Sequence, residues 1–585
     1  MVRKEIEKLL NEAIKKLNID GQASVSFSSL PGLCDYQSNS VFALAKKAGQ
    51  TPYELANKIV ETIKPTEFFT FEVARPAFIN IKLTQKGYNY FAELLYKDER
   101  CGVKKISNQK VLLDYGGANV AKALHVGHLR SPIIGEALKR LYKFLGEDVI
   151  SDVHLGDWGL QMGLTELQLY EDGKLDYYFS GKGAEPKLTL EMLNEAYPKA
   201  SARKNMDEEF KRKADEWTLK IQNKEQPYYD IYRKIREVSV KEIKKHYSEL
   251  GAEFDLWLGE SDADEYIDKA LGIIEDKGLS RISDGAVVVD VAVEGENVPI
   301  PKKSEDEVQR YKNPMPPAIL KKYNGGALYA TTDIATILMR NTEIGSLNRI
   351  EYIVDARQKN HFVQVFRVCK MAQISPANQE LIHIGYGTMN GSDGKPFKTR
   401  SGDTIKLEDI INMLIDKAGQ KLKSNGVEYD RHLALQIGVA AMKFGDLSNN
   451  VGKDYVFDLD KFLSFEGKTG PYLQYTVCRI NSILKKVKEE GGQINIESEE
   501  EREIVKNILK LNSSYEIAYK EKSLNNLCLA TFDLASAFST FYNNHKILTE
   551  KDDGKKASYI SLLKLVRKAL TQALYVLAIE VPEKM

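Results

Sequence analysis

The residues best placed to do chemistry lie within residues 114–131, where His125 and His128 flank Gly127. A strand-like run, 111–113, precedes them and a helical pattern follows, so we expect the pair at the first turn of a helix. A helix N-terminus attracts anions, and imidazole donors can strengthen as charge builds on a transferring phosphoryl group. Gly127 leaves room for a flat base against the backbone. The segment predicts an ATP site built for attack at a phosphate.

The two histidines have other interpretations when they are taken alone. They could form a surface pair or half of a metal site, with His154 as a possible third ligand. No carboxylate or cysteine spacing supports a metal, and the five scattered cysteines include no Cys-x-x-Cys pair. We therefore expect no metal bound by the protein itself, and a reducing compartment.

Composition narrows the class of protein. A chain of 585 residues with 43% hydrophobic and 28% charged residues is ordinary for a folded protein, and its length allows about three to four domains. No apolar run reaches the ~18 residues that span a bilayer, and the charged N-terminus is not a signal peptide, so we expect a cytoplasmic protein without a membrane partner. Lys+Arg equals Asp+Glu at 83 each, which leaves a nucleic-acid partner open.

Three parts of the chain must position these residues. Residues 1–105 begin with an amphipathic helix and contain alternating runs at 23–27 and 78–82, separated in part by a polar loop at 32–39, which predicts an α+β domain. Helical periodicity over 431–585 predicts an all-α helical bundle.

The central part, 106–430, predicts an α/β domain of the Rossmann type. Strand and helix patterns alternate over 106–170 and return at 352–355 and 381–386, so we expect an insertion at about 171–345. Ligands of open α/β sheets bind at the carboxyl ends of the strands. Asp114 and His154 would both lie there.

Several segments together resemble the class I aminoacyl-tRNA synthetases, and most closely the arginyl family. The segment from Asn119 to Ser131 resembles the family signature, and further similar segments begin at His154, Tyr329, Val354, Gly394, Gly467 and Pro582. The resemblance implies a Rossmann-type catalytic domain with an insertion, an N-terminal α+β domain that approaches the tRNA elbow and a helical anticodon-binding domain. It also implies attachment of L-arginine to tRNA(Arg) through an arginyl-adenylate, with Mg²⁺-ATP as co-substrate. The alternatives are another enzyme with a His-x-Gly-His signature and a non-enzymatic tRNA-binding paralogue.

By this resemblance, His125 and His128 hold the ATP phosphates and Gly127 makes room for the adenine. The loop 394–402 departs from the usual Lys-Met-Ser-Lys-Ser, because Pro-Phe-Lys-Thr-Arg stands at 396–400. Three cations of this loop are expected to contact ATP: Lys395, Lys398 and Arg400. Of these, Lys398 is expected to be catalytic. The residues alone favour a catalytic role and a solvated loop position for Lys122 equally. The resemblance makes Lys122 the catalytic cation that replaces the missing loop lysine.

Arginine selection needs acceptors for a planar guanidinium fork. Tyr329 and Asp333 share a face if Tyr329 opens a helix, although spacing alone favours a surface pair. The resemblance places both in the arginine pocket with Gln358, and it assigns the substrate's amino and carboxylate ends to Asp114, Asn119 and His154. Such a site needs no editing domain.

The expected tRNA contacts are aromatic. Phe78 and Asn80 resemble residues of the family's elbow-binding domain, and Tyr472 and Tyr475 begin a helix that could stack on anticodon-loop bases. The alternative for these aromatic side chains is a place in the core. The resemblance suggests that adenylate formation needs tRNA, and we expect a monomer.

Overall fold

The computed structural model describes residues 1–28, 32–293, 298–299, 311–312, 315–321, 328–391, 393–395, 405–487 and 490–585. The chain forms two compact units. The terminal unit comprises 1–104, 464–521 and 525–585, and the sheet unit comprises 105–463 with 522–524. None of the described helices is both long and apolar enough to cross a membrane.

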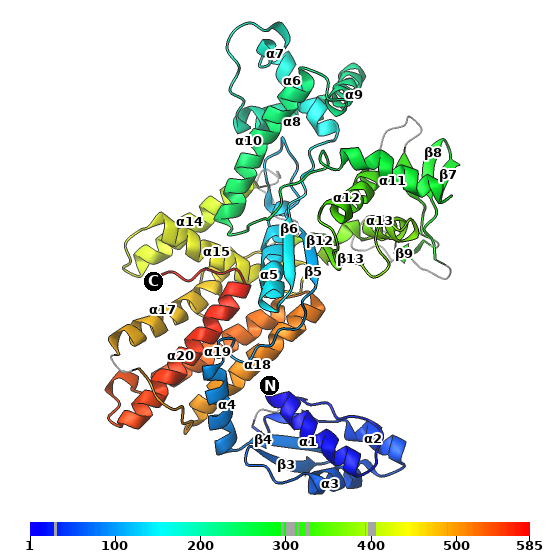
Figure 1. Cartoon of the computed structure of the whole chain (residues 1–585). Helices are drawn as coiled ribbons and strands as arrows, with labels where there is room; N and C mark the ends of the chain where they lie inside the picture. The colour runs from blue at the N-terminus through cyan, green and yellow to red at the C-terminus, as the bar shows by residue number, and fades with distance from the viewer. Residues whose placement is uncertain are drawn as a thin grey trace. The chain divides into compact units, whose positions relative to one another are not determined.

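A four-stranded parallel sheet lies at the centre of the sheet unit, in the order β13-β12-β5-β6 (Figure 1). Its strands are β5 (Lys110–Asp114), β6 (Asp148–Asp152), β12 (Arg349–Asp355) and β13 (Glu380–Tyr386). The apolar run of β5, Val111 to Leu113, is fully buried, as parallel strands covered on both faces require. Helix α5 (Arg130–Phe144) packs on this sheet. The predicted α/β class is confirmed.

The segment between β6 and β12 contains both helices and short strands. The helices are α6 (Leu160–Glu171), α7 (Asp176–Ser180), α8 (Leu190–Arg203), α9 (Glu208–Gln222), α10 (Tyr228–Glu249), α11 (Asp264–Asp276) and α12 (Tyr329–Glu343). The strands are β7 (Ser280–Ser283), β8 (Ala286–Val289), β9 (Val298–Pro299), β10 (Tyr311–Lys312) and β11 (Ala318–Lys321). Strands β11, β8 and β7 form an antiparallel sheet in that order, and β9 pairs with β10.

Further elements of the sheet unit lie on either side of β13. Before it come η2 (Ala356–Gln358) and α13 (Lys359–Met371). After it come β14 (Met389–Asn390), α14 (Leu407–Ser424), α15 (Arg431–Leu447), β15 (Tyr455–Val456) and α16 (Leu459–Phe462). Helix α15 packs on α14 and α5, and Asp446 of α15 forms a buried ion pair with Arg130 of α5 at 2.9 Å. These contacts keep α15 in the sheet unit, although we expected the helical domain to begin near residue 431.

The terminal unit contains a small antiparallel sheet and a helical bundle. The sheet order is β1-β2-β4-β3, with β1 (Ser26–Phe27), β2 (Tyr36–Ser38), β3 (Phe69–Ala74) and β4 (Phe78–Leu83). Its helices are α1 (Val2–Lys16), α2 (Val41–Ala48), α3 (Pro52–Thr62), α4 (Gln85–Lys97), α17 (Gly470–Lys486), α18 (Glu499–Glu521), α19 (Asn525–Asn544) and α20 (Asp553–Val576), with the short η3 (Ile547–Thr549). Strand β2 lies within the expected polar loop at 32–39, where Tyr36 is buried.

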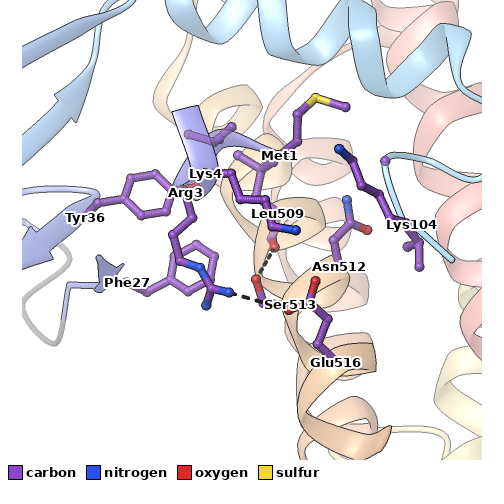
Figure 2. A pocket seen from close by; sticks show the side chains of 13 residues that line it. Met1, Arg3, Lys4, Phe27, Tyr36, Lys104, Leu509, Asn512, Ser513 and Glu516 are labelled. Atoms are coloured by element: carbon purple, nitrogen blue, oxygen red, sulfur yellow. Dashed lines mark hydrogen bonds and ion pairs between the residues drawn. The ribbon is translucent and has the colours of Figure 1, made fainter. Parts of the chain in front are cut away.

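Within this unit, α1 packs beside α18 around a small cavity (Figure 2). Arg3 of α1 forms an ion pair with Glu516 of α18 at 3.5 Å, and the Ser513 hydroxyl donates to the Leu509 carbonyl. The cavity volume is about 40 Å³, which is room for a few waters. It is therefore a packing gap and is too small for a nucleotide.

Candidate functional site

The two histidines of the signature lie in a single 3-10 turn, η1 (Val126–His128), just before α5. The His125 Nδ1 accepts from the Gly127 N–H at 3.1 Å, and the His128 Nδ1 accepts from the His125 N–H at 3.1 Å. The rings lie 4.0 Å apart between centroids. The two side chains accept hydrogen bonds from the backbone of their own turn. The pair therefore precedes the α-helix, whereas we had expected it in the first turn of that helix.

These hydrogen bonds determine how the imidazoles can act. Burial and the nearby Lys122 ammonium lower the pKa of His125, while burial, His125 and Lys122 lower the pKa of His128 to about 3. Both rings are therefore neutral near pH 7. Since each Nδ1 accepts a hydrogen bond, each neutral ring carries its proton on Nε2. The turn thus presents two neutral N–H donors, next to a Gly127 that is exposed.

The chain that follows the lysine-containing loop returns directly to this turn. The Val126 N–H donates to the Ile405 carbonyl at 3.0 Å, and the Leu407 N–H donates to the Leu124 carbonyl at 2.9 Å. Lys395 lies among the described residues and is exposed, and its backbone N–H donates a hydrogen bond to the Asp393 Oδ1. Lys398 and Arg400 lie outside the described residues.

Lys122 lies three residues after Asn119 in the signature, and its side chain is half-buried. Its Nζ lies 4.5 Å from the centre of the Tyr197 ring on α8. Asn119 forms an isolated bridge with Gly156, whose lack of a side chain is required because an added Cβ would lie 2.5 Å from the Asn119 Oδ1. The loop after β5 is thereby joined to the loop after β6.

Helix α12 brings the ends of β5 and β6 together. The Arg340 guanidinium of α12 is fully buried and contacts Asp114 and Asp152, each at 2.6 Å. Burial raises the pKa of Asp114 even though Arg340 and His154 oppose that effect, whereas at Asp152 these cations overcome burial and lower the pKa. Asp114 therefore lies at the predicted place, with Arg340 as its charge partner.

His154 faces the same helix. Its φ is +37°, and its Nε2 lies 3.4 Å from the Thr336 hydroxyl of α12, while its Nδ1 is buried without a partner among the described residues. A left-handed backbone at a histidine is uncommon, and such strain is usually kept where a side chain must be aimed. The free Nδ1 leaves one hydrogen-bonding position for a ligand.

Helix α12 begins at Tyr329, so Tyr329 and Asp333 lie one turn apart on the same face. The Tyr329 side chain is 68% exposed, and Asp333 accepts a hydrogen bond from the His361 Nε2 of α13. Gln358 lies in η2, directly after β12, and is exposed. An accessible carboxylate on an anchored helix, with a tyrosine one turn before it, fits a cationic side chain.

Glu260 is a member of this pocket that sequence reasoning missed. Burial raises its pKa to about 7, the carboxylates of Asp157 and Asp333 add repulsion, and His154 opposes the shift. Burial, and then Glu260, also raise the pKa of Tyr329. Glu260 is therefore a second carboxyl group within electrostatic range of Asp333, and a positive partner stabilises its ionised form. No spacing in the sequence indicates this residue.

Asp157 holds the Glu260 loop in place. Its fully buried carboxylate accepts from the Arg236 Nε at 2.7 Å and from the Ser261 N–H and hydroxyl at 2.9 Å each. The Glu260 N–H also donates to the Leu155 carbonyl at 3.0 Å. The segment after β6 thus carries both His154 and the clamp for Glu260.

In the terminal unit, the predicted residues of β4 are less accessible than expected. Phe78 is half-buried against Phe42, with ring centroids 5.6 Å apart. Asn80 is only 3% exposed, and its Oδ1 accepts from the Gln37 Nε2 at 2.8 Å. Asn80 can therefore influence a ligand only through Gln37.

An aromatic face is formed by Tyr472, Tyr475 and Arg479 of α17 with Phe532 and Tyr542 of α19. The Arg479 guanidinium donates to the Tyr475 hydroxyl at 2.8 Å and lies 4.6 Å and 5.3 Å from the Tyr475 and Tyr542 ring centres. Tyr472 lies 5.6 Å from Phe532 between centroids, and its hydroxyl lies 2.9 Å from that of Ser539. All five residues of the face are half-buried, so each keeps an accessible part. Cationic and aromatic groups in this combination suit single-stranded nucleic acid.

Three family models match the chain. The class I tRNA synthetase (R) catalytic domain matches residues 91–459. The DALR anticodon binding domain matches 473–585, and the arginyl tRNA synthetase N-terminal domain matches 4–83.

Known proteins resemble the chain over its whole length. Arginine–tRNA ligase of Agathobacter rectalis is 39% identical, with all of both chains covered, and that of Alkaliphilus oremlandii is 39% identical over 100% of this chain and 99% of its own. The structure resembles Plasmodium falciparum arginyl-tRNA synthetase, with a TM-score of 0.81 at 25% identity over 100% of this chain and 99% of that one. The Thermus thermophilus arginyl-tRNA synthetase has the same fold, with a TM-score of 0.80 at 22% identity and full coverage of both chains.

Proposed function

Because the chain belongs to the arginyl-tRNA synthetase family of class I aminoacyl-tRNA synthetases, we propose that the residues at the carboxyl ends of β5, β6 and β12 carry out its reaction. The chain charges tRNA(Arg) with arginine, and its substrates are arginine, ATP and tRNA(Arg). The alternative, a non-enzymatic tRNA-binding paralogue, has no comparable support, because the relatives that match the full length of the chain are named as ligases.

In the first step, a carboxylate oxygen of arginine attacks the α-phosphorus of ATP. A new phosphorus–oxygen bond forms, the bond to the β-phosphate oxygen breaks, and pyrophosphate leaves with the electron pair. In the second step, a hydroxyl of the terminal tRNA ribose attacks the arginyl carbonyl, and AMP leaves. No covalent enzyme intermediate is needed, so the residues act by positioning and by stabilising charge.

The neutral pair of imidazoles is the observation that carries the ATP assignment. His125 and His128 direct Nε2–H donors at the phosphates, and Gly127 leaves space for the adenine. Neutral donors keep their hydrogen bonds without placing two cations side by side. The positive charge comes from Lys122, with Lys395, Lys398 and Arg400 of the loop that ends at Ile405.

The guanidinium of arginine lies between Asp333 and Glu260, with Tyr329 and Gln358 lining the pocket. His361 orients Asp333, and the Asp157 clamp holds Glu260. Asp114, Asn119 and His154 contact the amino and carboxylate end, where the free Nδ1 of His154 is available. Two carboxyl groups accept from a planar fork better than from a point charge, which disfavours lysine.

The tRNA contacts belong to the terminal unit. Tyr472 and Tyr475 stack on anticodon-loop bases, with Arg479 supplying charge. Phe78 contacts the tRNA elbow, and Asn80 supports it by orienting Gln37. The matches to an anticodon-binding domain and to the family's N-terminal domain support these two assignments.

Mg²⁺ enters this proposal as the partner of the ATP phosphates, whose charge it neutralises. The described residues include no group of three His, Cys, Asp or Glu side chains that could hold a metal ion. We assign no side chain as a ligand of the ion, which enters as part of Mg²⁺-ATP. The protein works as a monomer in the cytoplasm, where its tRNA and ATP are found.

The Lys122→Ala variant tests the catalytic assignment. We expect it to slow adenylate formation by about 100-fold or more, because a charge on the α-phosphate is stabilised only in the transition state. Arginine affinity should stay within about twofold, since Lys122 does not contact the guanidinium. The exposed Lys174 of the same unit provides the matched control, Lys174→Ala. Weaker arginine binding at an unchanged rate would contradict the assignment.

A further inference from the structure

We propose that Tyr197 of α8 is a positioning residue for adenylate formation, because its ring holds the Lys122 ammonium in place. This inference rests on the proposed function of Lys122. Tyr197 itself contacts neither ATP nor arginine in this account. It acts through the lysine.

The contact between the two side chains is a cation–π interaction. The Lys122 Nζ lies 4.5 Å from the centre of the Tyr197 ring, and both side chains are half-buried. A lysine side chain has four flexible carbons and loses rotamer entropy when it is held in one position. An aromatic ring attracts the ammonium without adding a counter-charge, so the lysine stays ordered and keeps its full charge for a phosphate.

The held position lies within electrostatic reach of both signature histidines. Lys122 contributes, after burial, to the lowered pKa of His125, and it also acts on His128. Tyr197 in turn contributes to the raised pKa of Tyr329, after burial and Glu260. Tyr197 therefore contacts Lys122 and lies within electrostatic reach of Tyr329.

Pro198 follows Tyr197 inside helix α8, and a proline there has no N–H for the carbonyl of Asn194. The Asn194 Oδ1 is also buried without a partner among the described residues. Asn194 and Lys122 line one cavity of about 30 Å³, which places this turn of α8 beside the lysine. On either side, buried Leu193 and Ala200 anchor the helix.

The first test measures single-turnover adenylate formation with saturating tRNA(Arg). Tyr197→Leu removes the aromatic face and should slow this step by about 5- to 30-fold, the equivalent of one good cation–π contact. Arginine and ATP affinities should stay within about twofold. Tyr197→Phe keeps the ring and should retain most of the rate. If Tyr197→Leu lowers the melting temperature, Tyr197→Met preserves more volume without an aromatic face and takes its place.

A double-mutant cycle separates positioning from a purely structural role. If Tyr197 acts through Lys122, adding Tyr197→Leu to Lys122→Ala should cause no further slowing. Full additivity of the two effects would overturn the inference, and so would a normal rate for Tyr197→Leu when Lys122→Ala is slow. A normal rate for Lys122→Ala would instead contradict the proposed function on which the inference rests.

Discussion

At the scale of single residues, the site separates hydrogen bonding from charge. His125 and His128 are buried or close to a cation, so they stay neutral and donate through Nε2. Lys122 is left to supply the positive charge, held by a ring that does not neutralise it. A second protonated group beside Lys122 would repel it in a poorly solvated turn. Because the imidazoles are neutral, they do not repel the charged lysine in this small volume.

Glu260 makes arginine binding dependent on pH. Its pKa in the free protein is about 7, so the carboxyl group is largely neutral at pH 6 and ionised at pH 8. A guanidinium stabilises the ionised form, and arginine must therefore displace a proton when it binds below pH 7. We expect the Kd for arginine to fall as pH rises from about 5.5 to 7, by at most tenfold per pH unit, and to level off above. Calorimetric titration with arginine across this range measures the effect.

The matched variant for this prediction is Glu260→Gln, which keeps the shape of the side chain and removes its titration. It should bind arginine more weakly at pH 8 and show a flatter pH profile. An unchanged profile in Glu260→Gln would contradict the assignment of this pH dependence to Glu260.

Sequence reasoning found the residues that lie in recognisable segments. His125, His128, Asp114, His154 and Asp333 all lie at the ends of strands or at the start of a helix, where such side chains were expected. Their roles remain predictions. Glu260 and Arg340 were missed because their places depend on contacts between distant segments: Asp157 clamps the Glu260 loop, and α12 carries Arg340 to the ends of two strands.

At the scale of elements, the site depends on where three strands end and one helix begins. Strand β5 lies between β12 and β6, so the loops after β5 and β12 leave the sheet in different directions and open a crevice between them. Helix α12 supplies Tyr329 from its first turn, Asp333 from its second and Arg340 from its fourth. A rigid helix thereby sets the distance between the arginine acceptors and the strand ends.

The aromatic face of α17 and α19 makes a separate prediction. Arg479→Ala should weaken tRNA(Arg) binding several-fold and reduce its salt dependence, because it removes one charge and the stacking partner of Tyr475. Lys485→Ala removes an exposed charge from the same helix and is the control. Nitrocellulose filter binding at two salt concentrations provides the measurement. Equal effects of the two variants would indicate general electrostatics instead of a specific face.

Elements with strong periodicity were predicted closely, whereas short polar ones were not. The strands expected at 352–355 and 381–386 lie within β12 and β13, whose apolar side chains mark them in the sequence. Strands β7 to β11 were missed within the insertion. They are two to four residues long, and β7 is partly exposed, so they leave almost no alternation to detect.

At the scale of the whole molecule, the predicted three-part fold class is confirmed by family models over 4–83, 91–459 and 473–585. Periodicity could not show which unit the helices after residue 430 join. The buried Arg130–Asp446 ion pair and the packing of α15 on α5 decide that, and both join segments about 300 residues apart.

The measurement that tests the central claim most directly is pyrophosphate–ATP exchange with purified protein. Exchange should occur with arginine and not with lysine, because Asp333 and Glu260 accept from a planar fork. We expect it to depend on added tRNA(Arg). A folded protein that binds tRNA(Arg) but shows no arginine-dependent exchange, with or without the tRNA, would contradict the account.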